Sequence, residues 1–196
     1  MEKFGIAETR NFVVLGHGTC GKTTLVDSMM HKSGENSRFG RVDNGSSISD
    51  YTEEEKERKI SIFATPLHLT WKNHSVFLID TPGYADFFGE VTASVRVADS
   101  AVIVVDSSTG IGIGTQRTWD ETEKYGLGKL IYISRLDKEH TDFSKTYNEI
   151  VKTFGKKCVP VTVPAGKEGG ISAVANIISG GKMDALEEPL KGNVAR

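Results

Sequence analysis

The segment Gly-His-Gly-Thr-Cys-Gly-Lys-Thr, residues 16–23, decides how the rest of the chain is interpreted. It fits the pattern G-x-x-x-x-G-K-[ST] of phosphate-binding loops. The apolar run at residues 12–15 predicts a buried strand before it, and the spacing of apolar residues from Leu25 onward predicts a helix after it. In that arrangement backbone N–H groups and a helix N-terminus surround an anion. The alternative is a chance match in a chain with 21 glycines, which the flanking strand and helix disfavour.

The residue types in this loop suit a nucleoside triphosphate. Lys22 adds a full positive charge for the β- and γ-phosphates, and the Thr23 hydroxyl is a ligand for Mg²⁺. The loop residues that we expect to contact the nucleotide are His17, Gly18, Thr19, Cys20, Gly21, Lys22, Thr23 and Thr24.

Bulk composition narrows the class of protein. A chain of 196 residues with 38% hydrophobic and 26% charged residues is long enough for one globular domain with a small appendage. A net charge of −2 gives no global attraction to nucleic acid. There is no apolar run of the roughly 20 residues that span a bilayer, and the two cysteines indicate no disulfide framework. We therefore expect a cytoplasmic, monomeric fragment without a DNA or membrane partner.

Strand and helix patterns alternate along the chain, which predicts an α/β fold. The expected strands are residues 11–15, 60–71, 75–79, 101–106, 130–133 and 158–163. The expected helices are 24–32, a helix that begins at 85 or 88 and ends at 98, 115–125, 142–154 and 171–178. We expect a further short helix within residues 50–59, capped by Asp50, and we expect the polar stretch 33–50 before it to be mobile or ordered by a ligand. The prediction is a P-loop NTPase fold: a doubly wound, mostly parallel sheet with helices on both faces and one antiparallel edge hairpin.

A second motif, Asp80-Thr81-Pro82-Gly83, follows an apolar strand. Asp80 is expected to hold Mg²⁺ through a water molecule, because Mg²⁺ keeps much of its hydration shell. Gly83 can bring its N–H close to a γ-phosphate, and this bond exists only with a triphosphate, so the loop can act as a switch. The alternative for this tetrapeptide is a tight turn without a function.

A third motif, Ser134-Arg135-Leu136-Asp137, follows another apolar strand. The Asp137 carboxylate can accept hydrogen bonds from N1–H and the 2-amino group of guanine, donors that adenine does not offer there. The Arg135 guanidinium can stack on the base. The alternative is a strand followed by a helix with Asp137 as its cap. Because ligands of such sheets bind at the carboxyl ends of the strands, three polar loops at that edge support one shared site.

With these motifs the chain resembles the GTPase domain of the translational GTPases, in particular elongation factor G and its paralogues. The resemblance extends from about residue 10 to about residue 180, and its matching segments are residues 16–24, 50–62, 80–84, 134–137 and 159–179. It implies binding of GTP and GDP with Mg²⁺, GTP hydrolysis that the ribosome stimulates, and a low intrinsic rate. Family members are several times longer, so the ribosome would be met through the full-length protein. It also implies a division into a core, 1–157, and the start of an inserted subdomain or a last strand and helix, 158–196.

Residue by residue, the resemblance makes Lys22, Gly83 and Tyr84 the catalytic positions. Thr23, Ser61 and Asp80 become the Mg²⁺ site, with Ser61 in place of the usual switch-one threonine. His17 is typical of the family and is expected to orient backbone. The nucleotide contacts outside the phosphate loop are Asp80, Gly83, Ser134, Arg135 and Asp137.

Departures from the family pattern leave the activity open. Tyr84 stands where the family has the His that positions the attacking water, and a phenol cannot take up a proton near neutral pH. Hydrolysis is then slow, relies on another group, or is lost, leaving a GTP sensor or ribosome-binding regulator. A P-loop ATPase is a weaker third interpretation. Thr19 replaces an Asp, and Ser134-Arg135 replaces Asn-Lys. The last guanine-contacting motif is left open between Ser172-Ala173, Val163-Pro164-Ala165 and a position beyond Arg196.

Overall fold

The computed structural model describes residues 4–165, 171 and 173–178. The chain divides into two compact units, which are described separately: Met1–Val105 with Gly112–Tyr132, and Asp106–Ile111 with Ile133–Arg196. Of the predicted final segment 158–196, residues 166–170, 172 and 179–196 lie outside the described residues, and this range includes Ser172.

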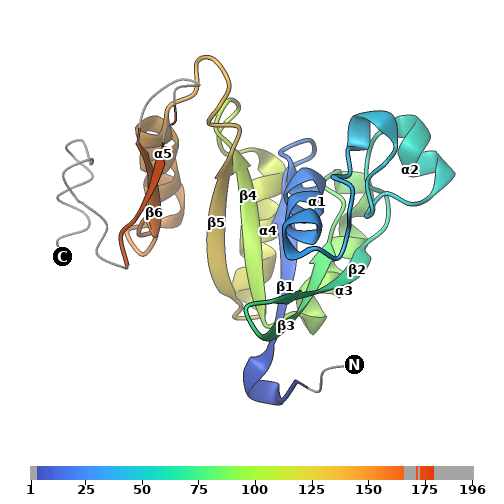
Figure 1. Ribbon diagram of the computed structural model, residues 1–196. Coiled ribbons are helices and arrows are strands. Elements are labelled where there is room, and N and C mark those ends of the chain that lie inside the picture. Colours follow the sequence, from blue (N-terminus) through green and yellow to red (C-terminus); the bar gives the residue numbers. More distant parts are fainter. Residues whose placement is uncertain (1–3, 166–170, 172, 179–196) are drawn as a thin grey trace. The chain divides into compact units, whose positions relative to one another are not determined.

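A five-stranded sheet with the strand order β2-β3-β1-β4-β5 is the centre of the first unit (Figure 1). Its middle strand β1 (Thr9–Gly16) pairs in parallel with β3 (His74–Asp80) and with β4 (Ser100–Asp106). β2 (Thr65–Trp71) pairs antiparallel with β3 and forms one edge, and β5 (Gly128–Ser134) forms the other. These pairings confirm the predicted α/β fold with its antiparallel edge hairpin.

Apolar residues cover both faces of this sheet, as the continuous apolar strands predicted. On one face Val13, Leu15 and Ile103 pack with α3 (Phe88–Val97). The partly buried Trp119 of α4 (Ile113–Lys124) packs on the same cluster.

On the other face Val14, Leu78 and Val104 pack against Val26 and Met30 of α1 (Lys22–Ser33). Because neighbouring side chains of a strand point to opposite faces, β1 joins the two layers. Its carboxyl end leads directly into the phosphate-binding loop.

Short helices complete the first unit: η1 (Ile6–Glu8), η2 (Val42–Asn44), α2 (Glu53–Arg58) and η3 (Ala85–Phe87). None of the helices in the described part of the chain is long and apolar enough to cross a membrane.

The second unit contains α5 (Phe143–Phe154) and a hairpin of β6 (Thr162–Ala165) and β7 (Ala173–Asn176). The Asp142 side chain caps α5 by accepting a hydrogen bond from the Lys145 N–H. Tyr147 of the helix and Val163 of β6 form a small apolar cluster, which joins the two elements.

Four sequence predictions need correction. The predicted strand 60–71 begins only at Thr65, because the N–H groups of residues 62–64 donate to side-chain carboxylates instead of to another strand. The cap of α2 is Thr52 and not Asp50, which is itself buried. The predicted strand 158–163 is found at Thr162–Ala165.

The fourth correction concerns residues 171–178, which were predicted to be helical. Their described part contains β7, which pairs antiparallel with β6. A short apolar run cannot be assigned to helix or strand from its periodicity alone, so the pairing partner decided the outcome.

Candidate nucleotide-binding site

The loop at residues 16–23 connects the carboxyl end of β1 to the start of α1. Gly16, Thr19 and Gly21 have positive φ angles of 141°, 61° and 97°. A Cβ at Gly16 would lie 2.5 Å from the Val104 carbonyl oxygen, so only glycine fits there. The backbone therefore makes a tight, close-packed turn of the kind that can surround a phosphate.

Lys22 is 5% exposed, and its ammonium group is held inside the loop. Nζ donates hydrogen bonds to the carbonyl oxygens of Gly16 at 3.3 Å and of His17 at 2.9 Å. These bonds fix the position of the charge beside the turn. The His17 ring packs near Gly112 and Gly114 at the start of α4, where an added Cβ would meet it at 3.0 Å and 2.7 Å. The ring therefore lies between the phosphate-binding loop and the start of α4.

The remaining loop residues differ in accessibility. Gly18 and Cys20 are buried, whereas Thr19 and Thr24 are exposed. Cys20 belongs to the apolar cluster on the α1 side of the sheet, so its side chain faces the core.

The Asp80-Thr81-Pro82-Gly83 segment at the end of β3 lies against the same loop. The Thr81 hydroxyl, fully buried, donates to the Val14 carbonyl oxygen at 2.6 Å and so ties this segment to β1. A Cβ at Gly83 would collide with Lys22 Nζ and with the backbone of Gly18. Only a glycine permits this approach, and it places the Gly83 backbone next to the buried lysine.

The Tyr84 ring lies over the phosphate-binding loop. Three of its ring carbons would be 3.4–3.5 Å from a Cβ at Gly18, and the residue is 41% exposed. The phenol therefore contacts the loop with its ring while part of it remains open to water.

Hydroxyl groups and a carboxylate gather beside Lys22. Thr23 Oγ1 and Ser61 Oγ are 3.0 Å apart although 38 positions separate the two residues. Asp80 Oδ2 accepts a hydrogen bond from Ser49 Oγ at 2.6 Å, and Oδ1 is buried without a partner among the described residues. Burial raises the pKa of Asp80, while the Ser49 hydrogen bond and the Lys22 charge oppose that rise.

Two further buried carboxylates lie near this group. Burial raises the pKa of Asp50 to about 6, a contact with Ser61 opposes the rise, and the negative charges of Asp80, Glu55 and Asp27 add to it. Burial also raises the pKa of Asp27, which accepts a hydrogen bond from the Ile48 N–H at 3.0 Å. The sequence assigned no role at the site to Asp27 and only a helix cap to Asp50.

The donor set beside Lys22 fits Mg²⁺. Two hydroxyls and a buried carboxylate oxygen without a partner are oxygen ligands of the kind that Mg²⁺ accepts together with phosphate oxygens and water. Among the described residues no group of three or more His, Cys, Asp or Glu is placed to hold a metal ion by itself. A metal here would therefore depend on hydroxyls and on a bound phosphate.

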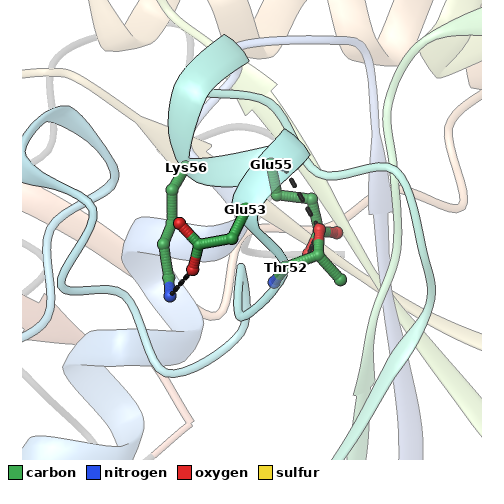
Figure 2. Close-up of polar contacts among 4 residues, drawn as sticks. All are labelled: Thr52, Glu53, Glu55 and Lys56. Atoms are coloured by element: carbon green, nitrogen blue, oxygen red, sulfur yellow. Dashed lines mark hydrogen bonds and ion pairs between the residues drawn. The ribbon is translucent and has the colours of Figure 1, made fainter.

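Glu55 organises the segment that carries Ser61, a role that sequence reasoning missed. Its side chain is fully buried, and Oε2 accepts from the backbone N–H of Thr52 at 3.1 Å and from its hydroxyl at 2.8 Å. Figure 2 shows this carboxylate beside Thr52, with the separate pair of Glu53 and Lys56 outside it. Oε1 accepts from the N–H groups of Ile62 at 3.0 Å and Phe63 at 3.2 Å.

The consequence is a closed loop from Thr52 to Phe63 around one carboxylate. Burial raises the pKa of Glu55, but the hydrogen bonds from Ile62, Thr52 and Phe63 outweigh it and hold the pKa below its ordinary value. The sequence signal that could have found this role is the capping box, a threonine followed three residues later by glutamate.

In the second unit, the Ser134-Arg135-Leu136-Asp137 segment leaves the end of β5. Ser134 is buried, Asp137 is exposed, and Lys138 N–H donates to the Arg135 carbonyl oxygen at 3.2 Å to close a turn. Asp137 does not cap a helix, because α5 begins at Phe143 with Asp142 as its cap. The Arg135 guanidinium, which the sequence suggested would stack on a base, is paired with the Asp106 carboxylate at 2.5 Å.

The comparisons with known proteins agree with this geometry. The family described as the elongation factor Tu GTP binding domain matches residues 7–190. Elongation factor G of Mycoplasma pneumoniae is 34% identical over 186 residues, which cover 91% of this chain and 27% of the relative. The mitochondrial ribosome-releasing factor 2 of Culex quinquefasciatus is 33% identical over 174 residues, covering 89% and 23%.

A solved structure from Thermus thermophilus has the same fold, with a TM-score of 0.84, 32% identity and coverage of 89% of this chain and 26% of that one. The chain thus spans about a quarter of the length of the relatives it matches. With the family matched over most of its length, the chain belongs to the elongation factor Tu GTP-binding-domain family and is a GTP-binding domain of the elongation-factor-G-like translational GTPases.

Proposed function

We propose that this domain binds GTP with Mg²⁺, hydrolyses it to GDP and phosphate, and uses the presence of the γ-phosphate as a conformational switch. The observation that carries the proposal is the close approach of the Gly83 backbone to Lys22 Nζ. A γ-phosphate bound by Lys22 would meet the Gly83 N–H at the same place, and this contact would be lost after hydrolysis.

The proposed roles of the side chains follow from their positions. Lys22 binds the β- and γ-phosphates, and the N–H groups of the loop surround them. Thr23, Ser61 and Asp80 hold Mg²⁺, Asp80 through a water molecule. The metal, when bound, supplies positive charge that neutralises the charge developing on the phosphate oxygens. The contact between Thr23 and Ser61 supports this set, because it joins the phosphate loop to the first switch.

For the base we propose recognition by Asp137, whose exposed carboxylate can accept hydrogen bonds from N1–H and the 2-amino group of guanine. Ser134 supports the turn from its buried position at the end of β5. The proposed cofactors are therefore GTP and GDP with Mg²⁺, and adenine nucleotides are excluded by the missing donors.

The proposed setting is translation in the cytoplasm. The domain would act as part of a longer protein that contacts the ribosome, which stimulates a low intrinsic rate of hydrolysis. The names of the relatives, elongation factor G and the mitochondrial ribosome-releasing factor 2, support a role in translation. We propose a monomeric domain without a DNA or membrane partner.

A second candidate function rests on Tyr84. Its ring packs over Gly18 and its hydroxyl is a poor base, so the domain would bind GTP as a sensor without efficient turnover. The two candidates share the nucleotide site and differ only in the chemical step.

Binding is tested first, by titrating the chain with fluorescent analogues of GDP, GTP and ATP in the presence of Mg²⁺. We expect guanine nucleotides to bind, ATP to bind at least a hundredfold more weakly, and Lys22→Ala to abolish binding. Equal affinity for the ATP and GTP analogues would refute the guanine assignment. Glu57→Gln, a change of an exposed side chain on α2, is the matched control.

Turnover is tested in the full-length protein by phosphate release with and without ribosomes. Comparable stimulation of wild type and Tyr84→Phe would show that the hydroxyl takes no part. A strong gain in Tyr84→His over a nearly inactive wild type supports the sensor. Loss of an existing activity in Tyr84→Phe assigns the hydroxyl a catalytic role.

A further inference from the structure

An ion pair between a buried carboxylate and a partly exposed guanidinium lies directly beside the proposed guanine loop. Asp106 ends β4, and its side chain is 4% exposed. Oδ2 pairs with Arg135 Nη1 at 2.5 Å, and Oδ1 accepts hydrogen bonds from the Ser108 N–H at 2.8 Å and its hydroxyl at 2.6 Å. All these residues belong to the second unit. The carboxylate therefore uses both oxygens, one for its own loop and one for the guanine loop.

The charge on Asp106 is stable in this setting. Burial alone raises the pKa of this carboxyl, but the hydrogen bonds from Ser108 and the charge of Arg135 outweigh burial and keep the pKa below its ordinary value. Removing the partner of a buried carboxylate leaves its charge uncompensated, which is unfavourable.

The ion pair restrains an unfavourable backbone turn at Arg135. Its φ of +58° is in the left-handed region, which is unfavourable for a residue with a side chain. The Ser107 N–H donates to the Ser134 carbonyl oxygen at 3.1 Å, so the two loops are joined by backbone immediately before this residue. The ion pair lies where the chain makes its unfavourable turn, and it opposes relaxation of that turn.

The other end of the loop is held separately. The Thr141 hydroxyl donates to the carbonyl oxygens of Leu136 at 3.1 Å and Lys138 at 2.6 Å, and Thr141 is 2% exposed. Between these two supports Asp137 is exposed, and it accepts no hydrogen bond from the described part of the chain. If the Asp137 carboxylate were flexible, binding the base would require it to become ordered, and the lost entropy would weaken binding. A loop that is fixed on both sides holds the carboxylate in one place before the base binds.

We propose that Asp106 is a positioning residue for guanine recognition: by binding the Arg135 guanidinium, it fixes the turn that presents Asp137 to the base. The inference rests on the proposed function of the loop as the guanine site. It assigns the guanidinium to the neighbouring loop instead of to stacking on the base. It also gives a reason for arginine at this position, because the guanidinium reaches and binds a carboxylate with directed hydrogen bonds.

The test compares the full chain with Asp106→Asn, Arg135→Gln and the double variant. The matched control is Glu149→Gln, since Glu149 supports the same loop as Asp106 by accepting from the Ile111 N–H at 3.1 Å but has no bond to the guanine loop. The affinities for GDP, IDP and ADP and the melting temperature are measured for each. IDP lacks the 2-amino group, so the ratio of the GDP and IDP affinities reports how well Asp137 is placed.

We expect Asp106→Asn and Arg135→Gln each to weaken GDP binding about tenfold, the loss expected from one charge-assisted hydrogen bond. Both should reduce the preference for GDP over IDP, and the double variant should be no worse than either single one. Glu149→Gln should keep the preference of the wild type even where its melting temperature falls. Arg135→Gln changes a side chain that is one-third exposed, so it keeps the test valid if Asp106→Asn does not fold.

The proposal is overturned if the single variants keep the GDP-to-IDP ratio of the wild type. It is also overturned if Glu149→Gln lowers the GDP-to-IDP ratio as much as the single variants do at a similar fall in melting temperature, or if the two single losses simply add in the double variant. A wild-type chain that binds ADP as well as GDP contradicts the proposed function itself, and that result is seen before any variant is made.

Discussion

Replacing Glu55 with Gln removes the charge around which the segment carrying Ser61 is folded. The carboxylate is fully buried and accepts four hydrogen bonds, two from Thr52 and two from the backbone of Ile62 and Phe63. The amide of glutamine has the same shape, but only one of its two atoms is an acceptor. The substitution therefore changes hydrogen bonding without creating a cavity.

The magnitude follows from the bonds that are lost. The amide oxygen can serve one pair of donors, and the NH₂ group then faces the other pair, leaving two donors without an acceptor. Each unsatisfied buried donor costs about 1–3 kcal/mol, so we expect a loss of about 2–6 kcal/mol in the free energy of unfolding of this segment. Lys56 and Glu53 form their exposed pair elsewhere on α2, so this pair does not compensate (Figure 2).

Urea denaturation and amide hydrogen exchange at residues 60–64 measure this loss. Glu54→Gln is the matched control, because Glu54 is an exposed neighbour on the same helix and its replacement should change stability by less than about 0.5 kcal/mol. If Glu55→Gln is no more destabilised than Glu54→Gln, and residues 60–64 exchange as slowly as in the wild type, the carboxylate does not organise the segment.

The pH dependence supplies an independent check. The folded pKa of Glu55 lies below its ordinary value of 4.5, so the unfolded chain binds the proton more readily. The stabilisation is then fully present above pH 4.5 and is lost as the pH falls through the folded pKa. The difference between wild type and Glu55→Gln should consequently be largest near neutral pH and should shrink in acid.

Three further substitutions test other contacts of the site. Asp50→Asn should stabilise the protein at pH 7, without nucleotide or metal, by up to about 3 kcal/mol. The folded pKa of Asp50 is about 6 and its ordinary pKa is 3.8, so the stability of the wild type falls as the pH rises between these values. Urea unfolding at pH 4 and pH 7 must show the gain in stability only at pH 7. Gly16→Ala should lower the melting temperature and abolish nucleotide binding, because its Cβ would meet the Val104 carbonyl oxygen at 2.5 Å; normal folding and binding would contradict the close packing. Thr81→Val should cost about 1 kcal/mol, since the Val14 carbonyl loses a donor at 2.6 Å, and an unchanged urea midpoint would show that bond to be unimportant.

The fold could be predicted from the sequence because its signals are local. Apolar runs such as 101–106 are long enough to be recognised as buried strands, and the glycine-rich loop at 16–23 fixes the first strand, turn and helix together. Because the strands are parallel, their carboxyl ends lie at one edge of the sheet, and this predicts that the polar loops gather there. The structure brings Gly83 to Lys22 as this rule requires.

The site contacts that were missed join residues far apart in the sequence. Ser49 and Asp80, which are 31 positions apart, form such a pair, and no periodic pattern encodes it. Thr23 and Ser61 are 38 positions apart, and only the family resemblance placed them together. The polar stretch 33–50 was expected to be mobile or ligand-ordered, but Ser47, Ser49 and Asp50 within it are buried. Polar composition is a poor guide here because the Ser47 hydroxyl accepts from the backbone of Ser49 and Asp50, and the Ser49 hydroxyl donates to Asp80, inside the fold.

Asp106 was missed for a different reason. It stands at the carboxyl end of β4, in the same kind of position as Asp80 at the end of β3, so the rule for parallel strands applied to it. It carried no known motif, whereas Asp80 did. The structure identifies it through its ion pair with Arg135, a contact that only the folded chain reveals.

The contacts of Lys22 set a condition on any ligand of the phosphate loop. Its ammonium group already has two carbonyl acceptors inside the loop, at 3.3 Å and 2.9 Å. A ligand that replaces these carbonyl groups gains only the difference in hydrogen-bond energy between its own acceptors and the two carbonyl oxygens. That difference is large for a charged phosphate, because hydrogen bonds between an ammonium and an anion are roughly twice as strong as those to neutral acceptors. Neutral ligands gain almost nothing, so the folded loop itself discriminates for anions. In the proposed function the same exchange releases the lysine toward the γ-phosphate, next to Gly83, and the binding step and the switch then depend on a single side chain.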